Sequence, residues 1–128
     1  MFLGRREFIL GSAATLGVMG SGFATPQAGK HEMFGLIGQM IAVPGQRDAL
    51  ISILLEGTHE MPGCLSYIVA KDTTDENAIW ITEVWDSEAS HQASLALPQV
   101  KSAITRGRPL IAKFASSTTT KPVGGHGL

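Results

Sequence analysis

Residues 78–98, AIWITEVWDSEASHQASLALP, contain the change of pattern that decides the fold. As far as Trp85 the residues are rich in β-branched and aromatic types and alternate between two sets, which is typical of a strand. Asp86 and Ser87 are residue types that cap a helix. Glu88 follows in the first turn, where the helix dipole favours a negative charge. The stretch therefore predicts a strand, a capped turn and a helix.

The predicted helix carries an imidazole whose direction bears on function. Ala89, Ala93 and Leu97 recur at helical spacing and form the expected inner stripe. On the same helical wheel His91 lies away from that stripe. The sequence therefore predicts that His91 faces the solvent or the side of the helix, as a surface histidine rather than a catalytic base.

Segments on either side extend the pattern into a complete domain. The expected strands are 34–43, 64–71, 78–85 and 110–115, and the expected helices are 46–59, one that begins at 87, and one over 98–107. This β-α-β-β-α-(α)-β order predicts an α+β fold of the ferredoxin-like, split βαβ type. One antiparallel sheet would carry its helices on a single face.

The third strand carries large apolar side chains on both of its faces. One set is Ile79, Ile81, Glu83 and Trp85, and the other is Trp80, Thr82 and Val84. If the helices cover one set, the other needs a second cover, because large apolar patches rarely stay exposed. The domain is also small, so a partner would help to bury its core. We therefore expect a homodimer in which two sheets meet face to face.

The two ends of the chain do not follow the pattern of the domain. Residues 1–28 have the layout of a twin-arginine-type signal peptide: Arg5 and Arg6 precede a modest apolar stretch, with cleavage expected after Ala24 or Ala28. We expect export to the periplasm or the cell exterior, with no stable membrane span after processing; a retained anchor is the alternative. Residues 33–116 then form the domain. Residues 117–128 lack apolar periodicity and are expected to be a flexible tail.

The composition excludes several classes of partner and site. A net charge of −1 provides no basic surplus for binding a nucleic-acid backbone. The single cysteine cannot form an internal disulfide, and the four histidines are isolated from one another, without CxxC or HExxH spacing. We therefore expect no nucleic-acid partner, no metal and no bound cofactor.

Several short segments, in this order, resemble antibiotic biosynthesis monooxygenase (ABM) domains. They are VPGQRDAL at 43–50, PGCLSY at 62–67, and ITEVWDSEAS followed by LALPQVKSA across 81–103. The resemblance spans about 34–116, nearly the whole expected domain. It implies a dimeric α+β barrel. It also implies oxidation of a quinol or an aromatic phenol by molecular oxygen, without flavin, haem or metal.

The resemblance also implies where a site would lie. Glu83 and Trp85 match the strand signature of the family, and Tyr67 matches the aromatic residue of the second strand, so these three are the candidate catalytic residues. They are expected to project together into a pocket between the sheet and the second helix, with His91 a weaker candidate. Many members carry helix histidines where this chain has Ser94 and Gln99.

Haem degradation is disfavoured, because Gln39 and Leu95 stand where the haem-degrading relatives carry an asparagine and a histidine. Structural roles remain open for each candidate: Trp85 as a core aromatic, Glu83 as a partner of a backbone amide or Arg108, and Tyr67 as a core residue. The two function classes are accordingly a cofactor-independent monooxygenase and a non-catalytic small-molecule-binding or stress-related barrel protein.

Overall fold

The computed structural model describes residues 32–128. The elements follow one another as β1 (Phe34–Ala42), α2 (Arg47–Gly57), β2 (Cys64–Lys71), β3 (Ala78–Trp85), α3 (Glu88–Ser94), α4 (Pro98–Gly107), a short 3-10 turn η1 (Arg108–Leu110) and β4 (Ile111–Thr120). The predicted element order is confirmed. The predicted signal peptide and both of its cleavage positions lie outside the described residues.

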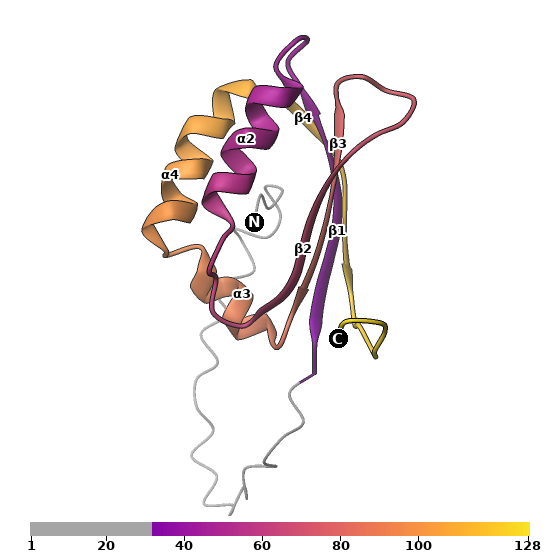
Figure 1. Ribbon diagram of the computed structural model, residues 1–128, viewed down its shortest axis with the longest axis vertical. Coiled ribbons are helices and arrows are strands. Elements are labelled where there is room, and N and C mark those ends of the chain that lie inside the picture. The colour runs from indigo at the N-terminus through magenta and orange to yellow at the C-terminus, as the bar shows by residue number, and fades with distance from the viewer. Residues whose placement is uncertain (1–31) are drawn as a thin grey trace, which may run out of the picture.

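The four strands form one antiparallel sheet in the order β2-β3-β1-β4. The helices lie together on one face of this sheet, as Figure 1 shows. This arrangement confirms the predicted α+β, ferredoxin-like fold. Within residues 32–128, none of the helices has the length and apolar character needed to span a membrane.

Local chemistry explains how β3 leads into α3. The hydroxyl oxygen of Ser87 accepts the backbone N–H of Ser90 at 3.1 Å, so the predicted helix cap is present. Gly63, just before β2, has a φ of 82° and packs so closely on Ser90 that a Cβ there would collide with it. The cap and this glycine together hold the start of α3 against the start of β2.

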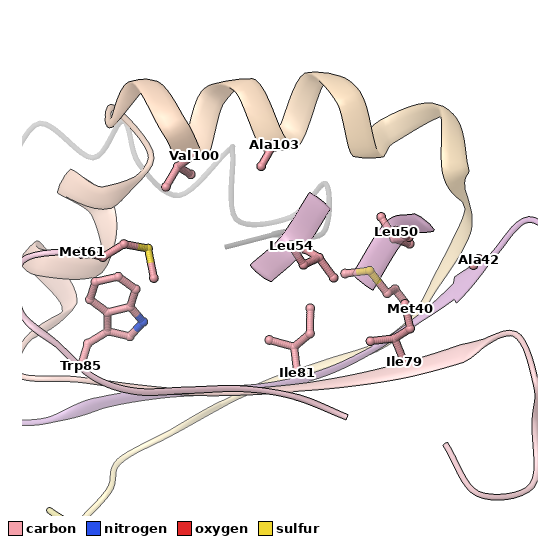
Figure 2. Close-up of a cluster of buried hydrophobic side chains, with 10 residues drawn as sticks. All are labelled: Met40, Ala42, Leu50, Leu54, Met61, Ile79, Ile81, Trp85, Val100 and Ala103. Atoms are coloured by element: carbon pink, nitrogen blue, oxygen red, sulfur yellow. The ribbon is translucent and has the colours of Figure 1, made fainter. Parts of the chain in front are cut away.

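The core fills the space between the sheet and the helices, as Figure 2 shows. It is apolar throughout and consists of Met40, Ala42, Leu50, Leu54, Met61, Ile79, Ile81, Trp85, Val100 and Ala103. Burial of each large side chain among these stabilises the fold by roughly 1.5–3 kcal/mol. Leu50 and Leu54 of α2 and Met61, which follows that helix, are buried here.

The orientation of α3 differs from the prediction. Ala89 and Ala93 are exposed, whereas His91 and Ser94 are buried, with 1% and 2% of their surface accessible. The predicted solvent-facing position of His91 is therefore wrong. Alanine loses little by facing water, so in a helix of seven residues an alanine stripe cannot outweigh the packing of its neighbours.

The last strand is longer than predicted. β4 continues to Thr120, and residues 117–120 pair with Gly35–Gly38 of β1, so this part of the expected flexible tail is strand. β-Branched threonines favour a strand even where neither face of it is buried. Because every residue from 112 to 120 is exposed, there was no apolar periodicity for a sequence reading to detect.

The two faces of the sheet separate as the alternation in β3 predicted. Ile79, Ile81, Glu83 and Trp85 are buried on the helix side. The opposite face presents exposed apolar side chains from three strands, namely Ile37, Ile68 and Trp80.

Candidate functional site

The buried acid of β3 lies at the centre of the candidate site. Glu83 and Trp85 are two residues apart on one strand, so both side chains project from the helix-covered face. Glu83 is only 3% exposed, and its Oε1 accepts the indole N–H of Trp85 at 3.1 Å. A buried carboxylate is costly without such partners. From the sequence, the expected partners of the Glu83 carboxylate are a backbone amide or Arg108, and the indole of Trp85 is not among them.

Tyr67 lies directly beside this acid. In the register of the sheet, Tyr67 of β2 is paired with Glu83 of β3. The phenolic oxygen is buried and makes no hydrogen bond to any residue of the described chain. Burial and, to a lesser degree, the charge of Glu83 raise the pKa of Tyr67 well above its ordinary value. The hydroxyl therefore keeps its proton and remains available as a donor.

His91 joins the cluster from α3. Its ring packs against Phe34 with centroids 5.1 Å apart, and edge-on against Trp85 with centroids 5.5 Å apart. Within the described part of the chain, neither ring nitrogen has a hydrogen-bond partner. Burial lowers the pKa of His91 from its ordinary 6.5 to about 4, so the imidazole is neutral at pH 7.

The sequence contained little signal for this position of His91. Polar Ser90 and Gln92 flank it, and the apolar periodicity of the helix points elsewhere. One feature of the sequence could have indicated that His91 is buried. It is the three-residue spacing between His91 and Ser94, which places these two buried residues on one face of α3.

A hollow adjoins Glu83 on the helix-covered side of β1 and β4. The cavity itself is about 20 Å³, and the hollow reaches about 350 Å³ when the space at its open mouth is included. The lining residues are Leu36, Gly38, Gln39, Met40, Ile81, Glu83, Phe114, Ser116 and Ser117. Gly38 lies between Leu36 and Met40 on β1, and its missing side chain leaves room there.

Only part of the predicted pocket wall is found in this hollow. Glu83 lines it, whereas Tyr67 and Trp85 contact Glu83 from outside the lining. Of the ionisable side chains in residues 32–128, Glu83 alone belongs to the lining. The arrangement is therefore an apolar pocket with one acid, beside which lie a phenol that keeps its proton and a neutral imidazole. In the same residues, no three His, Cys, Asp or Glu side chains gather in a way that could hold a metal ion.

The model of the antibiotic biosynthesis monooxygenase family matches residues 33–106. A candidate antibiotic biosynthesis monooxygenase from Chloroflexus aurantiacus J-10-fl is 66% identical, with 73% of this chain and 96% of that chain covered and a TM-score of 0.73.

Two more distant solved structures bear on the fold alone. One is a candidate of the same class from Caulobacter crescentus CB15, with 18% identity, 73% and 92% coverage and a TM-score of 0.67. The other is Rv0793 from Mycobacterium tuberculosis, with 18% identity, 73% and 98% coverage and a TM-score of 0.63. A search of curated proteins found no significant match. From the family match and the 66% identity together, the chain belongs to the antibiotic biosynthesis monooxygenase family.

Proposed function

We propose that the protein is a monooxygenase that oxidises an electron-rich phenol or quinol with molecular oxygen and without a bound cofactor. The family supplies the class of reaction. The observation that supports it here is the buried Glu83, which borders an apolar hollow and is held by the indole of Trp85. A carboxylate in such surroundings is suited to take a proton from a hydroxyl group of a ring.

The substrate itself supplies the electrons in this reaction. Loss of the hydroxyl proton to Glu83 gives a phenolate, which passes one electron to oxygen and forms superoxide. The two radicals join through a new C–O bond at a ring carbon that still carries hydrogen. The O–O bond then breaks, and one oxygen remains as a carbonyl. The other leaves as water, which carries the proton lost from the ring carbon and the proton that Glu83 had taken. A phenol thereby becomes a quinone, and a quinol becomes a hydroxyquinone.

The experiment is oxygen uptake by purified protein free of flavin, haem and metal, with 1,4-naphthalenediol and a panel of polycyclic phenols. Under oxygen-18 gas, we expect one labelled atom in the product and one in water. Formation of hydrogen peroxide with unlabelled product would instead identify simple oxidation. Uptake at the uncatalysed rate across the panel would contradict the proposal and favour the non-catalytic small-molecule binder.

We propose further that two copies associate through the open faces of their sheets. Ile37, Ile68 and Trp80 supply an exposed apolar surface of the kind that a second sheet covers. Val84 lies on this face and Ser102 is exposed on α4. Light scattering should give twice the chain mass. Val84→Asp should dissociate or unfold the pair, whereas the control Ser102→Asp should not; a stable unmodified monomer would contradict the proposal.

We propose that the protein is exported through a twin-arginine signal, from Arg5, Arg6 and the modest apolar stretch after them. Replacing both arginines by lysine should leave unprocessed precursor inside the cell, as cell fractionation would show. Normal export of the lysine variant would contradict the twin-arginine assignment.

A further inference from the structure

The strongest unexplained feature of the fold is the unpaired imidazole of His91. Buried polar groups in folded proteins are almost always hydrogen-bonded, because a buried group without a partner loses its bonds to water and gains nothing in return. His91 is 1% exposed, and both of its nitrogens lack a partner among the residues from 32 onward. Packing alone would be served as well by an apolar side chain of similar size.

His91 lies close to one end of the pocket. Phe34 and Trp85, which its ring contacts, are paired across β1 and β3. The next pair on the same face is Leu36 and Glu83, and both line the hollow. His91 therefore lies one residue pair beyond the end of the pocket.

A second unpaired group lies near the same acid. The hydroxyl of Tyr67 is also buried without a partner in the described chain, on the β2 side of Glu83. His91 reaches the neighbouring residue pair from α3. Two independent elements thus place unpaired polar groups around Glu83, the one buried carboxylate of residues 32–128, as expected of a site whose ligand supplies the missing partners.

The charges of the side chains around the pocket restrict the chemical class of that ligand. A neutral imidazole offers one N–H donor and one acceptor nitrogen, and a neutral phenol offers one O–H. Glu83 disfavours a ligand that arrives as an anion, and the described residues that line the hollow include no cation. An uncharged ring that carries hydroxyl or carbonyl oxygens satisfies all of these conditions.

We infer that His91 is a hydrogen-bonding residue of the substrate site and holds an oxygen atom of an uncharged hydroxyaromatic ligand that extends from the pocket past Glu83. This rests on the proposed function for the identity of the ligand. The three polar residues then have different tasks. Glu83 takes the proton, while the N–H of His91 and the O–H of Tyr67 stabilise the negative charge that develops on the ring oxygen.

The test measures binding and stability in the absence of oxygen, with 1-naphthol as the probe and calorimetry as the measurement. His91→Leu should weaken binding about tenfold, which corresponds to the loss of one good hydrogen bond. The same variant should keep or raise Tm, because it removes an unpaired buried polar group. His91→Gln, which retains a donor and an acceptor, should restore most of the binding. The control His59→Leu alters an exposed histidine and should change neither quantity.

Binding of 1-naphthol by His91→Leu at the unaltered affinity would overturn the inference, whatever happens to Tm. A loss of binding that His91→Gln does not restore, or a lack of saturable binding by the unaltered protein, would also overturn it. The readout does not depend on turnover. A protein that binds 1-naphthol through His91 but consumes no oxygen would support this inference and contradict the proposed monooxygenase.

Discussion

The space between the sheet and the helices has two ends that differ in chemistry. At one end Met40, Leu50 and Ile79 pack together in the apolar core, as Figure 2 shows. At the other end, around Trp85, the buried residues include Glu83 and His91. At its apolar end, the layer between the sheet and the helices thus stabilises the fold. At the other end it holds buried polar groups, which are costly unless they are hydrogen-bonded.

The largest expected effect separates the acid's chemistry from its packing. Glu83→Gln keeps the shape of the side chain and can still accept the indole N–H of Trp85, but it removes the charge and the base. We expect oxygen consumption to fall by about 10²–10⁴-fold, the usual range for loss of a general base. The melting temperature should change little. Unchanged turnover together with a lowered Tm would make Glu83 a structural residue.

A substitution at the apolar end should have the opposite signature. Leu54→Ala opens a cavity beneath α2 and should lower the free energy of unfolding by about 2–5 kcal/mol. The rate per folded molecule should be retained. Leu55→Ala is the matched control, because its side chain is 56% exposed and its loss should matter little. Urea denaturation measures both variants, and equal effects would contradict the placement of the core.

Acid should destabilise the polar end through His91. Its pKa is about 4 in the folded chain and 6.5 ordinarily, so below pH 6.5 the unfolded chain takes up the proton first. Stability should therefore fall as the pH drops from about 6.5 to about 4, by at most about 3 kcal/mol from this group. The comparison is with His91→Leu, which lacks this group, so its urea midpoint should depend less on pH. Identical pH profiles would contradict the assignment.

The smallest expected effect tests whether substrate lies in the hollow. Gly38→Ala places a methyl group among the lining residues, 3.3 Å from the carbonyl oxygen of Ser116, so a small local shift accommodates it. We expect KM for a substrate to rise a few-fold, with kcat and Tm nearly unchanged. An unaltered KM would show that the ring binds elsewhere.

Much of the architecture could be predicted from residue patterns alone. The bounds of β2 and β3 agree with the predicted 64–71 and 78–85, and Ser87 caps α3 as its residue type suggested. Such features depend on near neighbours in the chain, so alternation, capping chemistry and turn residues report them directly. Strand alternation also placed Glu83 and Trp85 on one face, whereas Tyr67 became a candidate through the family resemblance.

By itself, then, the sequence determined the order of the elements, the covered face of β3 and the shared face of its acid and indole. Tertiary structure alone decided the rotation of α3 that buries His91, the indole bond to Glu83, and a hollow that joins Gly38 of β1 to Phe114 of β4. The physical reason is the distance along the chain over which each feature is decided. Periodicity describes a segment and its own faces, whereas these features arise from contacts between side chains brought together only when the sheet and helices pack.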